Sequence, residues 1–182
     1  NAELVSLLDL TATTLAAANV PRPLLMQSHS LIGERTTPPR SYAFAARDRI
    51  DETEQRIRSV HDPRFHYIRT LSTGPTFASL NRYKEKCFPI YPLMRQLLAE
   101  GKLTGAPLEL MQRTGPGEEL YDRRSDPHEI KNLAASTQPE HREALIRLRA
   151  ALDTWLVETG YRGNLPEPRD IVAPFTKEMH DW

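Results

Sequence analysis

Arginine is the residue type in this sequence that is best suited to chemistry with an anion. The chain has 19 arginines against 5 lysines, although its formal net charge is zero. A guanidinium group donates two parallel hydrogen bonds to a carboxylate, phosphate or sulfate, which an ammonium group cannot do. Six of the arginines share one short span: Arg47, Arg49, Arg56, Arg58, Arg64 and Arg69. They predict an anion-binding surface or, in the simpler interpretation, a solvated strand surface with ion pairs.

Other kinds of catalytic or binding site have little support in the sequence. The six histidines are scattered, and no H-E-x-x-H pair occurs among them. There is neither a G-x-S-x-G elbow nor a glycine-rich phosphate loop. The single cysteine, Cys87, excludes an internal disulfide and is interpreted as a partly buried thiol. The zero net charge and the lack of an apolar run of about 18 residues argue against nucleic-acid binding and a membrane span.

The stretch from Gly115 to Ala135 is predicted to pass from a strand to a helix. Residues 119–122 are apolar and aromatic after a Gly-Pro-Gly turn, which favours a strand. Asp126 suits a helix N-cap, Pro127 the first helical position, and Glu129 the third residue after the cap. Turn and cap geometry also accounts for Asp126 without a role as a metal ligand.

The remaining elements follow from hydrophobic periodicity. Helices are predicted over 3–17, 89–100 and 139–159, and strands over 41–47, 55–61 and 65–72. The last two strands form a hairpin around Asp62-Pro63-Arg64, with proline at the second turn position. The sequence from residue 161 onward is rich in proline and is predicted to be an extended strap or partly disordered.

These elements indicate an α+β fold. We expect a small, about four-stranded antiparallel sheet packed on one face by the long C-terminal helix, with the other face toward solvent or another domain. Residues 1–40 are interpreted as a docking helix and linker, 41–163 as the folded subdomain, and 164–182 as an extended tail. The apolar helix over 3–17 needs a partner surface.

Four stretches of the chain resemble the C-terminal part of the sulfatase family. EELYDRRSDPHEIKNLA at 118–134 is similar to the E-L-Y-D-x-x-x-D-P-x-E-x-x-N-L-A signature of that family. The likeness is greatest to the heparan N-sulfatase (sulfamidase) branch, and it covers residues 3–163 in order. The three further stretches are VSLLDLTATTLAAANVPRP at 5–23, IRSVHDPRFHYIRTLS at 57–72 and LRAALDTWLVETG at 148–160.

The resemblance implies a larger hydrolase, of which this chain is the C-terminal third. In sulfatases a formylglycine in a C-x-P-x-R motif attacks sulfur, and a divalent cation, usually Ca²⁺, assists. Cys87-Phe88-Pro89-Ile90-Tyr91 departs from that motif at its fourth and fifth positions. The nucleophile and the Ca²⁺ ligands are therefore expected in an N-terminal α/β domain upstream of Asn1, and this chain alone is expected to be inactive. The family implies a periplasmic, secreted or lysosomal location.

The resemblance also suggests substrate-binding residues. In sulfatases the end of the first strand of this subdomain lies at the mouth of the active-site pocket. Here that segment begins with Arg47, Asp48 and Arg49. The two arginines are expected to bind anionic groups of a sulfated sugar, and Asp48 to accept hydrogen bonds from sugar hydroxyls. The aligned stretch in the sulfamidase branch carries His and Glu, so the identity of the sugar stays open. Two alternatives remain: a stand-alone binding module without chemistry, and part of a phosphoesterase of the same superfamily.

Overall fold

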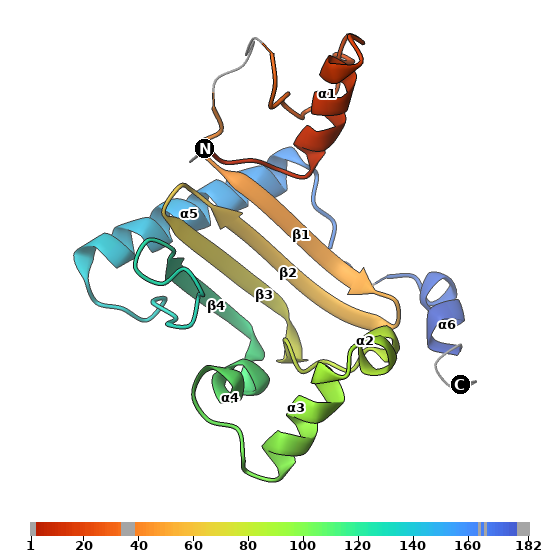
Figure 1. Ribbon diagram of the computed structural model, residues 1–182, viewed down its shortest axis with the longest axis vertical. Helices are drawn as coiled ribbons and strands as arrows, with labels where there is room; N and C mark the ends of the chain where they lie inside the picture. Colours follow the sequence, from red (N-terminus) through yellow and green to blue (C-terminus); the bar gives the residue numbers. More distant parts are fainter. Residues whose placement is uncertain (1–2, 34–38, 164, 166, 178–182) are drawn as a thin grey trace.

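The centre of the molecule is an antiparallel sheet of four strands in the order β1-β2-β3-β4 (Figure 1). The computed structural model describes residues 3–33, 39–163, 165 and 167–177. The strands are β1 (Ala43–Ile50), β2 (Thr53–His61), β3 (Phe65–Pro75) and β4 (Thr114–Asp122). All four predicted strands are present, with shifted ends, and the predicted α+β fold class is confirmed.

Helix α5 (Pro139–Glu158) covers one face of the sheet (Figure 1). Leu145, Leu148 and Leu152 recur at helical spacing, so their side chains meet the sheet along one stripe. Alternate strand residues complete the core, because successive side chains of a strand point to opposite faces. The core consists of Val60, Phe65, Tyr67, Leu120, Ala144, Leu145, Leu148 and Leu152.

Within the ranges that the structure describes, five further helices surround the ends of the sheet. They are α1 (Leu8–Ala17), α2 (Arg82–Cys87), α3 (Ile90–Ala99), α4 (Gly105–Gln112) and α6 (Arg169–Lys177). Helices α2, α3 and α4 gather at the end of the sheet far from α1 (Figure 1). Helices α2, α4 and α6 were not predicted, and α6 corrects the expectation of an extended tail. In the described part of the chain, no helix is long and apolar enough to cross a membrane.

The helix predicted to start at Asp126 does not form. Glu129 has a positive φ of 53°, and its N–H donates to the carbonyl of Asp126 over 3.1 Å, which closes a turn. The Asp126 carboxylate instead accepts the N–H of Lys131 over 2.8 Å. Asn132 fixes this loop to β4, because its Oδ1 accepts the N–H of Leu120 over 3.0 Å and its Nδ2 donates to the carbonyl of Glu118 over 3.1 Å. The part of the 118–134 stretch that follows β4 is thus a loop that is hydrogen-bonded to this edge strand.

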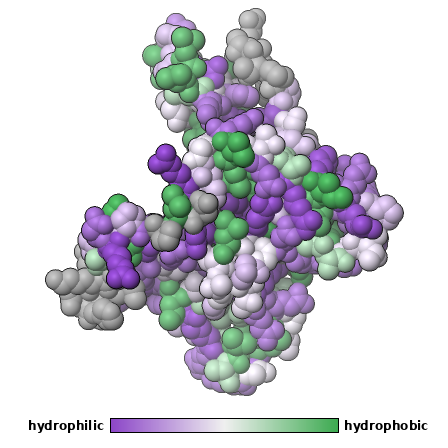
Figure 2. Space-filling model, turned by 180° about the vertical axis from the view of Figure 1, so that it is seen from behind, coloured by the Kyte–Doolittle hydropathy of each residue, from purple (hydrophilic) through white to green (hydrophobic). Residues whose placement is uncertain are grey.

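Three leucines at the start of helix α1 are uncovered. Leu7, Leu8 and Leu10 are 85%, 60% and 56% exposed, whereas Asp9 and Ala12 are buried. Hydrophobic residues are visible on this helix at the top of the molecule (Figure 2). The expectation that the first helix needs a partner surface therefore still stands for these leucines.

A buried ion pair ties α1 to the segment that follows it. The side chain of Asp9 is fully buried and binds the guanidinium of Arg40 through both carboxylate oxygens. It also accepts the N–H of His29 over 2.7 Å and the N–H of Ser6 over 2.8 Å. Burial alone would raise the pKa of Asp9, but these four hydrogen bonds outweigh it and lower the pKa to about 2.

We expect Asp9→Asn to loosen α1 and its following segment above pH 4. The folded pKa lies below the unfolded value, so the stabilisation is present above the unfolded pKa and is lost as the pH falls through about 2. At neutral pH the expected cost is about 2 kcal/mol. Amide hydrogen exchange at His29 and Ser6 measures this loss of local stability. A difference between the wild type and the variant that stays constant from pH 7 to pH 2 would contradict this explanation.

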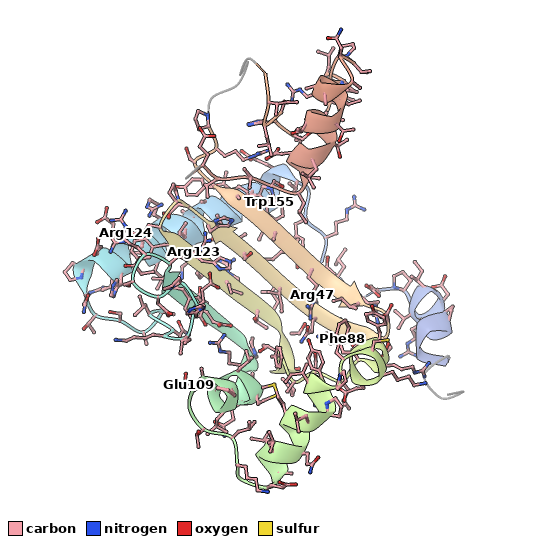
Figure 3. The ribbon with its side chains drawn as sticks, viewed as in Figure 1. Arg47, Phe88, Glu109, Arg123, Arg124 and Trp155 are labelled. Atoms are coloured by element: carbon pink, nitrogen blue, oxygen red, sulfur yellow. The ribbon has the colours of Figure 1, made fainter. Side chains whose placement is uncertain are left out.

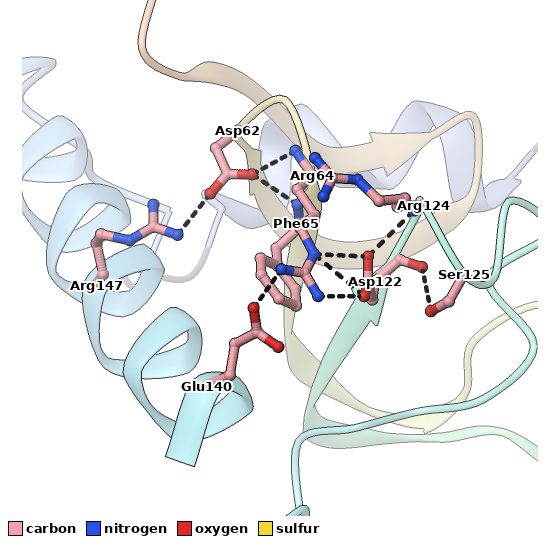
Figure 4. A network of polar contacts seen from close by, with 8 residues as sticks. All are labelled: Asp62, Arg64, Phe65, Asp122, Arg124, Ser125, Glu140 and Arg147. Atoms are coloured by element: carbon pink, nitrogen blue, oxygen red, sulfur yellow. Dashed lines mark hydrogen bonds and ion pairs between the residues drawn. The ribbon is translucent and has the colours of Figure 1, made fainter. Parts of the chain in front are cut away.

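A second network joins the β2–β3 turn, the end of β4 and helix α5 (Figure 4). The carboxylate of Asp62 accepts the N–H groups of Arg64 and Phe65 over 2.7 and 2.6 Å, which confirms the predicted turn. Its other oxygen accepts from Arg147 of α5 over 2.6 Å. Arg64 in turn binds Asp122 at the end of β4 and Glu140 of α5. These contacts fix the first half of α5 against the sheet.

Candidate functional site

The face of the sheet opposite α5 carries the polar residues that could meet a ligand (Figure 3). Val60, Tyr67 and Leu120 lie side by side in the register and point to α5. Their neighbours in each strand therefore point the other way. We call this side of the sheet the open face; it carries Arg47, Ile57, Ser59, His61, His66 and Ile68.

Arg47 lies at the end of the open face that is nearest to α2 and α3 (Figure 3). It is the last regular residue of β1 before a register shift between Arg47 and Arg49. Its Nε atom is buried and has no hydrogen-bond partner among the described residues. Burial lowers the pKa of the guanidinium, while the nearby phenol of Tyr91 acts in the opposite direction. Arg47 thus places a partly desolvated cation on this face.

Asp48 and Arg49 are held by other protein groups. The register shift after Arg47 breaks the alternation of the strand. Asp48 forms an ion pair of 2.5 Å with Arg58, whose side chain is 1% exposed. Arg49 binds Glu167 of the tail over 2.7 Å. The three residues suggested by the resemblance are therefore consecutive in sequence, but only Arg47 lacks a charged partner among the described residues.

Arg58 explains why Asp48 is held in place. Its guanidinium donates to the carbonyls of Arg47 and Ile57 over 2.7 and 2.9 Å and stacks on the ring of Tyr161 at 4.4 Å. The interpretation of the six arginines as a solvated surface is wrong for this member, because Arg58 is buried. A buried guanidinium needs a carboxylate, and Asp48 supplies it.

A histidine cluster occupies the other end of the open face. His61 and His66 are directly opposite in the β2–β3 register, with ring centroids 5.6 Å apart. The Nδ1 atom of His66 lies 2.9 Å from a carboxylate oxygen of Glu129, and Arg123 lies 3.3 Å from the ring of His61. Burial, followed by the charges of His66 and Arg123, lowers the pKa of His61. The hydrogen bond from His66 lowers the pKa of Glu129.

This cluster was missed in the sequence because Glu129 was assigned to a helix cap. The hairpin around residues 62–64 does predict that His61 and His66 face each other, since they flank the turn symmetrically. The position of Glu129 depends on the loop conformation, which has no periodic signal. In the structure the cluster anchors that loop to the sheet.

Cys87 is exposed at the end of α2, so its interpretation as a partly buried thiol is wrong. Helix α2 has only six residues and buries none of them, which leaves the thiol at the surface.

Comparison with known proteins shows which proteins this chain is similar to. No protein-family model matches it. It is 38% identical over 165 residues to an ulvan-active sulfatase of Formosa agariphila, and the match covers 91% of this chain and 27% of that enzyme. It is 30% identical over 174 residues to human N-sulphoglucosamine sulphohydrolase, with 85% and 32% covered. The chain is homologous to the C-terminal part of sulfatases.

Solved sulfatase structures share the fold of this chain. A putative sulfatase from Bacteroides thetaiotaomicron matches with a TM-score of 0.54 and 24% identity, covering 88% of this chain and 27% of that chain. A 2-O GAG sulfatase matches with a TM-score of 0.52 and 23% identity, covering 84% and 25%. The chain thus spans about a quarter to a third of the length of the proteins that it resembles.

Proposed function

We propose that this chain is the C-terminal part of a larger sulfatase that hydrolyses a sulfate ester or N-sulfate on a sugar. The observation that carries the proposal is the 38% identity to an ulvan-active sulfatase across 91% of the chain. The substrate class is a sulfated glycan, either of the heparan glycosaminoglycan type or a related polysaccharide. The exposed leucines of α1 support a neighbouring domain, because a helix with such a surface gains stability by burying it.

The chemistry itself is proposed to come from residues outside this chain. A formylglycine nucleophile and a Ca²⁺ ion would act in the N-terminal α/β domain. Among the described residues there is no group of three or more His, Cys, Asp or Glu side chains that could hold a metal ion. We further propose that this chain alone is inactive, and that its role is to complete the fold and to shape the rim of the pocket.

The residues proposed for the rim have different tasks. Arg47 contacts the anionic sugar, because its guanidinium lies on the open face without a carboxylate among the described residues. Asp48 and Arg49 hold the end of β1 through their ion pairs with Arg58 and Glu167. A free sugar hydroxyl would compete with Arg58 for Asp48.

A substrate panel tests the proposal on the complete gene product. We expect inorganic sulfate to be released from at least one of ulvan oligosaccharides, N-sulfated glucosamine and O-sulfated heparan disaccharides. Phosphate release from 4-nitrophenyl phosphate is the matched control and should be negligible. Phosphate release alone would favour a phosphoesterase, and no release of either anion would favour a binding module.

A further inference from the structure

Two cations meet where β1 reaches α2 and α3. Arg47 comes from β1, and Lys84 is the third residue of α2. Burial lowers the pKa of Lys84, and the charge of Arg47 lowers it further. The adjacent acid in the sequence, Glu85, is already bound by Arg95. Like charges held together in a partly desolvated site are unfavourable unless an anion joins them.

Aromatic rings line the same place. The ammonium of Lys84 lies 5.3 Å from the ring centroid of Tyr91, and that ring lies 6.4 Å from Phe88. Phe88 meets Tyr83 edge to face at 5.5 Å. Phe88 and Tyr83 are 44% and 58% exposed. In Figure 3, Phe88 and Arg47 are both labelled at the end of the sheet that is nearest to α2.

This combination suits a particular ligand. A sulfate or carboxylate group accepts hydrogen bonds from a guanidinium and neutralises an adjacent ammonium. The apolar C–H face of a pyranose ring packs on an exposed aromatic side chain, which offers a large rigid surface. A phosphate or sulfate ion alone would bind the two cations but would not contact the aromatic rings.

We propose that Arg47 and Lys84, with the rings of Phe88 and Tyr83 beside them, form a subsite for an anionic sugar residue. The sulfate or carboxylate lies between the two cations, and the sugar ring lies on the exposed aromatic surface. This inference rests on the proposed function, because it takes the ligand to be part of a sulfated glycan. The subsite binds a residue of that glycan by its charge and does not take part in bond cleavage.

Binding measurements on the complete gene product test the subsite. The probe is a heparin-derived tetrasaccharide, titrated by calorimetry at 50 mM salt, with its desulfated, N-acetylated and carboxyl-reduced counterpart as the uncharged control ligand. We expect Arg47→Ala and Lys84→Gln each to weaken binding about tenfold or more, since each removes a hydrogen bond to a charged group. Phe88→Ala should weaken the binding of both ligands. Arg142→Ala is the matched control: this exposed arginine of α5 lies behind the sheet, and its loss should leave the affinity within about twofold.

The outcomes separate the two proposals. Affinities of Arg47→Ala and Lys84→Gln within twofold of the wild type would overturn the subsite, as would a wild type that does not prefer the sulfated ligand. A drop in melting temperature without a change in affinity would also overturn it, because the cations would then face a carboxylate of the protein. Sulfate release in the substrate panel is read independently, so a failed subsite and a failed sulfatase function give different results.

Discussion

Asp122→Ala is expected to lower the free energy of unfolding by about 3 kcal/mol, because it removes the buried carboxylate of an ion pair together with its hydrogen bonds to the backbone. Asp122 ends β4 and is 4% exposed. Its carboxylate accepts from Nη2 of Arg64 over 2.8 Å and from the N–H of Arg124 over 3.1 Å (Figure 4). Without it, Arg64 keeps only its more exposed partner Glu140, and the loop after β4 loses its first anchor.

Urea unfolding at pH 7 measures this change, and Asp153→Ala provides the control. Asp153 also pairs with an arginine of the sheet, Arg69, over 2.6 Å, but its side chain is 59% exposed. An exposed pair of this kind contributes less than about 1 kcal/mol. The hydrogen bond from Arg64 lowers the pKa of Asp122, so the cost of Asp122→Ala should shrink as the pH falls below the unfolded pKa. Equal costs for the two variants would contradict the assigned role of burial.

Leu148→Ala should lower the free energy of unfolding by a similar amount, about 3 kcal/mol, because it removes buried contacts and leaves a cavity. Leu148 is fully buried where α5 crosses the sheet, in the cluster that contains Val60, Tyr67 and Leu120. The matched control is Ile146→Ala in the same helix, because Ile146 is 62% exposed. It should cost less than about 1 kcal/mol. Thermal unfolding of both variants tests this prediction. A similar loss of unfolding free energy in both would mean that α5 does not pack as described.

The sheet and α5 could be predicted because their signals are periodic. Phe65 and Tyr67 alternate with polar residues, and Leu145, Leu148 and Leu152 repeat at helical spacing, so burial alone orients both elements. Their pairing follows from the turn at residues 62–64. The ends of the strands were less certain, since β4 extends back to Thr114 through a Gly-Pro-Gly sequence that usually ends a strand.

The loop after β4 could not be predicted from local rules. Asp126, Pro127 and Glu129 match a helix start, yet the side chain of Asn132 binds the β4 backbone and Glu129 binds His66. These partners are distant in sequence, and together they outweigh a cap that contributes about 1 kcal/mol. The short helices α2 and α4 were missed because neither has a buried stripe of its own.

The candidate site was predictable in composition but not in geometry. The cluster of arginines indicates anion binding, yet the sequence does not distinguish Arg47, which has no carboxylate partner among the described residues, from Arg58, which is buried against Asp48. The two side chains point to opposite faces of the sheet because Ala46 pairs with Arg58 and Arg47 pairs with Ile57, and the residue types do not specify this register. Lys84 and Phe88 join Arg47 only through the tertiary fold.

The most direct test of the central claim removes this segment from its enzyme. Sulfate release by the complete gene product is compared with release by the same product ended before Asn1, alone and mixed with this chain. We expect the shortened product and this chain to be inactive separately, and the mixture to recover part of the activity. A shortened product with the full kcat/KM would contradict the claim that this chain completes a sulfatase.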